Sequence, residues 1–358
     1  MTDLELIALL VNLVFCLPSL ASATKFDHWW IRGFDFPRVQ ISIIIMANIV
    51  LALFAYNFDE WWHFFLVGAL LLGLAYQIVL IYPYTTFAKV QVILYEGENN
   101  LDNISILVSN VLTPNREYHK LIDLVRERDP DILLTLESDK KWEEALCVLE
   151  TRYGYSEKVP LDNLYGMHLY SKLPLEEIEV KYLIQDDIPS IHGHVRLPNG
   201  KRVKIHCLHP RPPSPNESKT STNRDAELLL TGRDIEDNAE RVLVFGDLND
   251  VAWSRTTGLF LKMSGLLDPR RGRGFFNTFN ADYLLVRWPL DHVFHTDDFT
   301  LIDIARERNI GSDHFPIYIK LNYMARAKRL QEGLEPDREE EEWAEEKIQR
   351  ANPKEESL

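Results

Sequence analysis

The chain has 358 residues, a formal net charge of −15 and a hydrophobic content of 46%. This length allows one large domain with accessory segments. The negative charge argues against a broad basic surface for tight, non-specific binding of duplex nucleic acid. The 3 cysteines provide no disulfide framework and, without a C-x-x-C spacing, do not point to zinc.

The first 90 residues differ sharply from the rest. Nearly uncharged apolar segments occupy about residues 6–23, 39–58 and 61–82, and each is near the roughly 20 residues that cross a hydrocarbon core. Aromatic side chains cluster at their ends, as at a membrane interface: Trp29, Trp30, Trp61, Trp62, Tyr82 and Tyr84. A buried helical domain is one alternative, and a cleaved signal peptide is disfavoured by an N-terminus with acids and no Lys or Arg. We predict three transmembrane helices.

The distribution of Lys and Arg predicts an orientation. Lys25, Arg32 and Arg38 lie between the first two segments and Lys89 follows the third, whereas the N-terminus and the turn at 57–60 have none. The positive-inside rule then predicts a multi-pass integral membrane protein whose C-terminal part is cytoplasmic. The reverse orientation is the alternative.

The remainder reads as a linker at 91–101, an α/β domain at 102–322 and an acidic tail at 323–358. Apolar periodicity predicts helices at 115–128, 140–151 and 217–237, and Asn199-Gly200 predicts a hairpin turn. Helices mixed with continuous apolar strands favour two packed sheets flanked by helices. We expect the tail to be solvated or disordered, with an amphipathic helix for a partner as the alternative.

Polar residues stand at the ends of six strand-like runs, where ligand-binding and catalytic groups are expected. In chain order they are Asn110, Glu137, His209, Asp247 with Asn249, Asp291, and Asp313 with His314. One such residue would be an accident, but six in order indicate a site. The adjacent Asp250 is better explained as a turn former.

This ordered set resembles the endonuclease/exonuclease/phosphatase superfamily, the metal-dependent phosphodiesterases related to pancreatic-type DNase. The resemblance covers about residues 102–322, and the stretches 271–275 and 288–293 look most like its membrane-attached bacterial branch, often called YafD-like. It implies a DNase I-like four-layer α/β sandwich. Two departures are Leu136 where many relatives have Gln before the Glu, and a Pro-rich exit after His209.

A phosphodiesterase of this kind needs a cation on the phosphate and an activated water. Mg²⁺ prefers a few carboxylates plus water, so Glu137 is the first-choice ligand with Asp313 and Asn110 as neighbours, and Mn²⁺ is the other candidate ion. The resemblance implies the same assignments.

The remaining polar residues have expected roles in the reaction. Asp247 would orient or deprotonate the attacking water, and Asn249 would bind that water or a phosphoryl oxygen. His314 and His209 would donate to the phosphate, and Asp291 would fix the ring of His314. Which histidine is acid or base stays open.

Arg271 and Arg273 are candidate substrate contacts within the only dense basic cluster, with a solvated loop as the alternative. The leading hypothesis is a membrane-anchored, metal-dependent phosphodiesterase, most plausibly a nuclease. One alternative is a phospholipid or inositol-phosphate phosphoesterase of sphingomyelinase type. Another is a catalytically idle scaffold that binds a partner through its acidic tail. The expected partners are the bilayer and a nucleic acid or other phosphodiester, without a stable protein partner.

Overall fold

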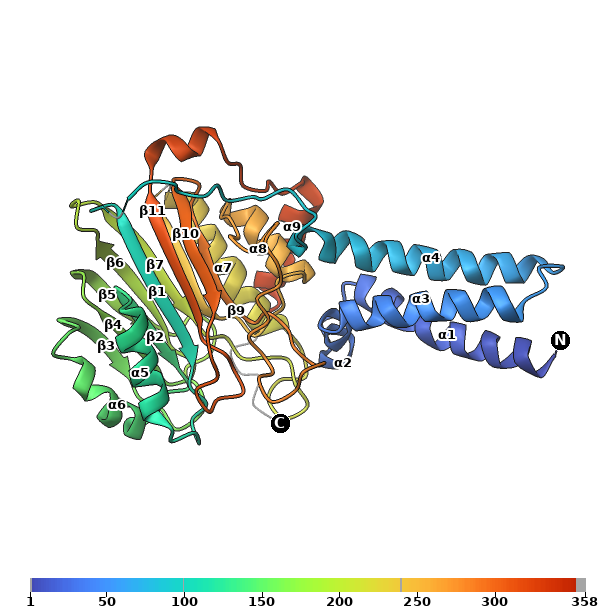
Figure 1. The fold of residues 1–358 in the computed structure, drawn as a ribbon, viewed down its shortest axis with the longest axis horizontal. Coiled ribbons are helices and arrows are strands. Elements are labelled where there is room, and N and C mark those ends of the chain that lie inside the picture. The colour runs from blue at the N-terminus through green and yellow to red at the C-terminus, as the bar shows by residue number, and fades with distance from the viewer. Residues whose placement is uncertain (1, 99, 239, 352–358) are drawn as a thin grey trace.

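The computed structural model describes residues 2–98, 100–238 and 240–351. Three long helices extend from one side of a layered α/β domain (Figure 1): α1 (Asp3–Ala23), α3 (Arg38–Ala55) and α4 (Trp61–Ile81). By length and composition each of them could cross a membrane. Some polar side chains inside the bundle are paired, with Asn12 donating to Tyr56 and Gln77 to Ser19, and such pairing lowers the cost of polar groups where water is excluded.

The α/β domain contains two sheets. The strands are β1 (Asn103–Asn110), β2 (Ile132–Leu136), β3 (Tyr155–Val159), β4 (Met167–Ser171), β5 (Leu175–Lys181), β6 (Ser190–Arg196), β7 (Arg202–Leu208), β8 (Val242–Asp247), β9 (Asp291–His295), β10 (Phe299–Arg306) and β11 (Ile317–Tyr323). One sheet has the order β10-β11-β1-β2-β4-β3 and the other β5-β6-β7-β8-β9. Each contains one parallel pair, β1 with β2 and β7 with β8.

The main apolar core lies between the two sheets, and helices cover their outer faces (Figure 1). The side chains of α5 (Tyr118–Arg128) and α6 (Lys140–Leu146) pack on the six-stranded sheet, and those of α7 (Thr222–Asn238) and α8 (Arg255–Ser264) pack on the five-stranded sheet. The continuous burial of β1, β2 and β8 follows from this sandwich, since strands covered on both faces read as unbroken apolar runs. The predicted four-layer architecture is confirmed.

Local predictions are confirmed with small shifts. The turn at Asn199-Gly200 joins β6 to β7 as an antiparallel hairpin. The predicted helix at 115–128 begins at Tyr118, because the Asn115 side chain instead donates to the carbonyls of Val111 and Ile310.

The described part of the tail, residues 323–351, is not the solvated extension that its charge suggests. Within it, α9 (Arg338–Gln349) packs on α7 and α8, with Trp343 buried beside Leu229 and Leu259. Lys347 is also buried, and its ammonium lies 2.6 Å from a carboxylate oxygen of Asp225. The apolar face of α9 is therefore part of the domain.

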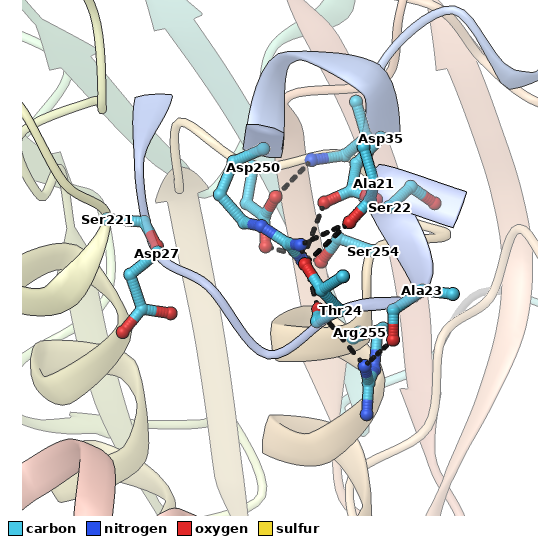
Figure 2. Close-up of polar contacts among 12 residues, drawn as sticks. Ala21, Ser22, Ala23, Thr24, Asp27, Asp35, Ser221, Asp250, Ser254 and Arg255 are labelled. Carbon is cyan, nitrogen blue, oxygen red and sulfur yellow. Dashed lines mark hydrogen bonds and ion pairs between the residues drawn. The ribbon is translucent and has the colours of Figure 1, made fainter. Parts of the chain in front are cut away.

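The segment between α1 and α3, which includes the short helix α2 (Trp29–Arg32), docks on the α/β domain (Figure 2). The Arg255 guanidinium donates to the carbonyls of Ala23 and Thr24 at 2.8 and 3.3 Å, and the Ser221 amide donates to the Asp27 carbonyl at 2.8 Å. We call residues 24–37 the docking segment. Its contacts connect the helical bundle to the domain.

Candidate active site

The strand directions bring the predicted polar residues to one edge of the sandwich. Parallel strands end on the same side of a sheet, so Asn110 at the end of β1 and Glu137 just after β2 lie side by side. The antiparallel β9 begins where β8 ends, and Asp247 and Asp291 are register partners. The two sheets meet at this edge, where the Asn110 amide nitrogen donates to Asp247 Oδ2 at 3.2 Å.

Asp247 lies at the centre of the site and is almost fully buried. Its Oδ2 atom is 3.5 Å from His314 Nε2 and 3.9 Å from His209 Nε2. Its Oδ1 atom accepts the backbone N–H of Asn249 at 2.9 Å. Burial raises the pKa of this carboxyl, although the two histidines and the amide oppose the shift. Asp247 therefore links both histidines to the loop after β8.

His314 is held by Asp291, as predicted. The His314 Nδ1 atom lies 2.8 Å from Asp291 Oδ2, and the ring packs against Phe279. Burial opposes the charged ring, but Asp291 and Asp247 together raise the pKa of His314 to about 10. The ring is therefore protonated at neutral pH and directs Nε2–H toward Asp247.

The pKa of His209 is shifted in the opposite direction to that of His314. It is buried beside Tyr165, with ring centroids 5.3 Å apart. Burial lowers the pKa of His209 to about 4, although the nearby Asp247 carboxylate opposes the shift. Since no negative partner binds its Nδ1 atom in the described part of the chain, this ring is neutral. The two histidines thus differ in charge because only one has a dedicated carboxylate.

Glu137 occupies a strained turn at the end of β2, with φ of 57°, a region in which non-glycine residues are uncommon. Its carboxylate accepts the Asn110 amide at 2.9 Å, and its carbonyl accepts the Thr113 hydroxyl at 2.8 Å. Burial raises the pKa of Glu137 to about 7; Asn110 and His314 oppose the shift, and the carboxylates of Asp313 and Asp247 add to it. Strain of this kind is frequent at functional sites.

The loop after β8 is shaped by two unusual backbone conformations. Gly246 has φ of 148°, and a Cβ there would lie 2.0 Å from the Leu208 carbonyl oxygen, so only glycine fits. Asn249 has φ of 51°, and its side-chain amide donates to the Pro210 carbonyl at 3.0 Å. The amide nitrogen of Asn249 therefore ties the loop after β8 to the loop after β7.

The other predicted residues divide into two groups. Asp313 belongs to the cluster, because its charge acts on Glu137, and its backbone carbonyl accepts the Ala281 amide. Arg273 instead donates to the carbonyls of Val92 and Pro269, and Arg271 lies over the Tyr84 ring. Both arginines contact the segment that leaves α4. The expectation that they bind substrate has no support in their contacts.

Sequence reasoning missed a buried arginine behind the site. The Arg224 guanidinium donates to the Asn249 carbonyl at 2.8 Å and lies 3.3 Å from Asp250 Oδ1. Asp250 is buried and also accepts the Ser254 and Thr257 hydroxyls, so it is more than a turn former. Its carbonyl accepts His292 Nε2 at 2.9 Å. The signal in the sequence was the Arg224-Asp225 pair shortly before the apolar run at 228–230.

The donor set fits a hard divalent cation. Ligand atoms of Asp247, Asp291 and His314 lie within 4.8 Å of one another, and the contact of His314 Nδ1 with Asp291 leaves Nε2 as the ring nitrogen that could face a cation. Glu137 offers a carboxylate whose pKa is raised toward neutrality beside Asp313 and Asp247. Carboxylate oxygens are the ligands that Mg²⁺ and Mn²⁺ prefer, and the assignment of Glu137 with Asp313 to the cation stays a prediction.

The fold and the site together define a phosphoesterase of the DNase I-like class. A family model described as the Endonuclease/Exonuclease/phosphatase family matches residues 107–314, more than half of the chain. The protein belongs to this family, whose members hydrolyse phosphoester bonds and generally depend on divalent metals. The YafD-like branch stays a prediction.

Solved structures with the same fold are distant in sequence. Danio rerio TDP2 complexed with single-strand DNA product has 16% identity and a TM-score of 0.51, over 62% of this chain and 99% of that chain. The human Nocturnin catalytic domain with bound sulfate has 15% identity and a TM-score of 0.51, over 64% and 96%. An endonuclease/exonuclease/phosphatase family protein from Bacteroides thetaiotaomicron has 17% identity and a TM-score of 0.50, over 62% and 98%. The sequence matches no curated protein.

Proposed function

We propose that this protein is a membrane-attached, divalent-metal-dependent phosphodiesterase, and that its first substrate class is nucleic acid. The observation that carries the proposal is the position of Asp247 between a protonated and a neutral histidine, with Glu137 linked to it through Asn110. Among the described residues of this cluster, the protonated His314 is the one cationic side chain. A phosphodiester carries a single negative charge, which suits such a site.

The side chains of this site have distinct proposed roles. The Asp247 carboxylate accepts a hydrogen bond from the attacking water and aligns it with the phosphorus. His314 donates Nε2–H to a phosphoryl oxygen, and Asp291 keeps its ring in the required orientation. His209, from the other side of Asp247, supplies a neutral contact to the same phosphate.

Glu137 and Asp313 would hold the cation, with Mg²⁺ as the first candidate and Mn²⁺ as the second. When bound, it would neutralise phosphoryl charge and stabilise the leaving oxygen. Asn110 directs its amide nitrogen at both Glu137 and Asp247, so its role is to keep the two carboxylates apart and oriented.

Membrane attachment is proposed from the helices α1, α3 and α4, which are long and apolar enough to span. The docking segment lies against the α/β domain, which is consistent with both being on one side of the membrane. We expect the protein to stay in the membrane fraction after carbonate extraction. The cytoplasmic side is predicted from Lys and Arg alone, and protease protection in sealed vesicles tests it.

A lipid phosphodiester is the second candidate substrate, and one feature favours it. Leu284 and Leu285 are exposed in a loop whose Leu285 carbonyl accepts the Gln40 side chain of α3 at 2.7 Å. The same loop contacts Asp313 through the Ala281 amide. The loop thus connects the active-site edge with the start of a helix that is proposed to cross the membrane.

The test is hydrolysis by the detergent-purified, full-length protein with Mg²⁺, on supercoiled plasmid, single-strand DNA, RNA and sphingomyelin in parallel. We expect nucleic acid cleavage that EDTA abolishes and that Asp247→Asn lowers by roughly 10²-fold or more. Asp234→Asn is the matched control, because Asp234 is an exposed partner of Lys204. Cleavage of sphingomyelin alone would assign the lipid candidate, and no hydrolysis of any phosphoester would favour the idle scaffold.

A further inference from the structure

A cavity lies where α3 meets the loop at residues 275–288. Its volume is about 540 Å³. One wall is the first turns of α3, and the other is the loop together with Trp253. The apolar lining residues are Val39, Ile43, Ile44, Trp253, Phe275, Leu284, Leu285 and Trp288. We call this cavity the α3 groove.

The apolar surface of the α3 groove continues onto a helix that is long enough to cross a membrane. Leu284 and Leu285 are 78% and 79% exposed, and Ile43 on α3 is 57% exposed. Gln40 fixes the loop to the first turn of α3 through the Leu285 carbonyl. Exposed apolar side chains at the end of a spanning helix lie at the depth of the lipid headgroups and upper acyl chains.

Two arginines line the same groove and are not neutralised. Arg287 and Arg306 stack over the Phe315 ring, with 5.0 and 4.6 Å to its centroid. Their guanidiniums donate to backbone carbonyls: Arg287 to Asn280 and Ala281, and Arg306 to Asn277. In the described part of the chain neither is paired with a carboxylate, although the protein carries a net charge of −15.

The charge of Arg287 acts on Arg306. The pKa of Arg306 is lowered by burial and by the neighbouring charge of Arg287. Two like charges at one ring repel each other, and an anion between them would relieve the repulsion. Guanidinium groups match phosphate oxygens in geometry, so a phosphate is the anion of choice.

We propose that the α3 groove binds one anionic phospholipid, with its phosphate at Arg287 and Arg306 and an acyl chain along Ile43, Leu284 and Leu285. A polar backbone of nucleic acid would leave this apolar wall exposed, whereas a lipid covers it. A net negative headgroup is required because two positive charges exceed what a zwitterionic headgroup neutralises. This inference rests on the proposed membrane attachment and is independent of the proposed hydrolysis.

The location also gives the lipid a structural consequence for the active site. Phe315 directly follows His314, and Ala281 of the same loop donates to the Asp313 carbonyl. A phosphate at Arg287 and Arg306 would therefore hold the rim of the catalytic cluster against the bilayer surface.

The test measures lipid binding to delipidated, full-length protein in detergent by native mass spectrometry, with phosphatidylglycerol and phosphatidylcholine as probes. We expect phosphatidylglycerol to bind roughly tenfold more tightly. The double variant Arg287→Gln/Arg306→Gln should lose this preference. Arg308→Gln, whose guanidinium pairs with Glu127 on the surface, should keep it.

A second variant tests the apolar wall without touching the charges. Leu284→Ser/Leu285→Ser alters side chains that are already exposed, so the fold should be retained, as thermal unfolding will check. It should lower the binding affinity for both lipids by a similar factor, because both lipids make the same acyl-chain contact. An unchanged affinity for both lipids would overturn the position assigned to the acyl chain.

Three further outcomes are informative. If the arginine double variant keeps the preference for phosphatidylglycerol, the headgroup assignment is wrong. If it keeps that preference and instead loses binding of an oligo-dT strand, the arginines serve nucleic acid and the proposal is overturned. Asp247→Asn should leave the lipid preference intact whether or not the protein hydrolyses any phosphodiester, so the two proposals fail separately.

Discussion

The two sheets each supply half of the candidate site, but the halves are supported differently. On the six-stranded sheet, the Asn110 amide donates to Glu137 and the Thr113 hydroxyl donates to the Glu137 carbonyl, so these contacts join the ends of two neighbouring strands. On the five-stranded sheet, the loop that carries Asp247 and Asn249 rests on the buried Arg224. Glu137 is thus held by partners at the strand ends of its own sheet, whereas the second half is also linked to parts of the chain outside the sandwich.

The support of the second half is a line of buried charges. Arg224 lies 2.7 Å from Asp225, and Asp225 lies 2.6 Å from Lys347 of α9. Lys347 in turn lies 2.6 Å from Asp27 in the docking segment. Buried charges are stable only when they are paired. Removal of one partner from a buried pair therefore costs more folding free energy than the intact pair contributes. The membrane-proximal segment is thereby linked to the catalytic loop.

The largest effect is expected for Arg224→Gln. The change leaves Asp225 and Asp250 with less positive charge and removes a donor to the Asn249 carbonyl. We expect the free energy of unfolding to fall by roughly 3–5 kcal/mol and the hydrolytic rate to fall with it. Chemical denaturation and plasmid cleavage, both in detergent, measure the two effects.

The matched control on the other half is Arg116→Gln. Arg116 pairs with Asp139 at 2.6 Å, two residues after Glu137, but its side chain is 37% exposed. Its loss should cost less than about 1 kcal/mol. Equal losses for the Arg116 and Arg224 variants would remove the contrast between the halves.

Glu137→Gln should separate activity from stability. The substitution removes a carboxylate from the proposed cation site. We therefore expect the Mg²⁺ concentration that gives half-maximal hydrolysis to rise by about 10–100-fold or more. It also removes a charge that burial and the nearby Asp313 and Asp247 disfavour, so the free energy of unfolding should not decrease. The measurements are the hydrolytic rate as a function of Mg²⁺ concentration and a thermal unfolding curve. A loss of stability with an unchanged response of the rate to Mg²⁺ would contradict the assignment.

Lys347→Met tests the contribution of α9. Lys347 is buried between Asp225 and Asp27, but Asp225 keeps Arg224, so we expect a smaller loss of about 2 kcal/mol. A double-mutant cycle with Asp27→Asn should give a coupling energy above about 0.5 kcal/mol. The exposed Lys328, which lies 3.4 Å from Asp297, is the control position for a Met substitution. Additive effects in the cycle would argue against the link to the docking segment.

A pH-dependent effect is expected from Glu227 on α7. Burial raises the pKa of Glu227 from 4.5 to about 8, and its Oε1 atom has no hydrogen-bond partner in the described residues. The folded state retains a proton that the unfolded state releases, so this group lowers stability as pH rises from 4.5 toward 8. Glu227→Gln should be at least about 1 kcal/mol more stable than wild type at pH 8 and nearly equal at pH 4. Urea unfolding at both pH values measures the difference, and parallel curves would contradict it.

The sequence predicted those parts of the site that depend on local order. A polar residue at the end of a buried strand needs only its own strand to be placed, so Glu137 and Asp291 could be recognised. The hairpin at Asn199-Gly200 follows from its turn residues in the same way. In the parallel pairs β1–β2 and β7–β8 both strands end at the same edge of the sheet, so the residues at those ends lie together.

Contacts between distant positions could not be predicted. Asp250 is interpreted as a turn former from the sequence alone, because the sequence does not show that its partner, Arg224 on α7, lies next to it. Arg271 and Arg273 formed the densest basic cluster, but charge density does not tell where a side chain points, and they turn toward the segment after α4. The charge of the tail concealed one buried face of α9, because Trp343 and Lys347 are few among many acids.

The pairing of Asp27 with Lys347 also has a consequence for the order of events during translation. The two residues are separated by 320 positions, and a ribosome adds roughly 5–20 residues per second. Asp27 therefore leaves the ribosome on the order of tens of seconds before its partner exists. The helical bundle and both sheets can form in that interval, but the charge line behind Asn249 is completed only when α9 emerges. A chain interrupted before Lys347 would carry every side chain of the candidate site and still lack the last support of its catalytic loop.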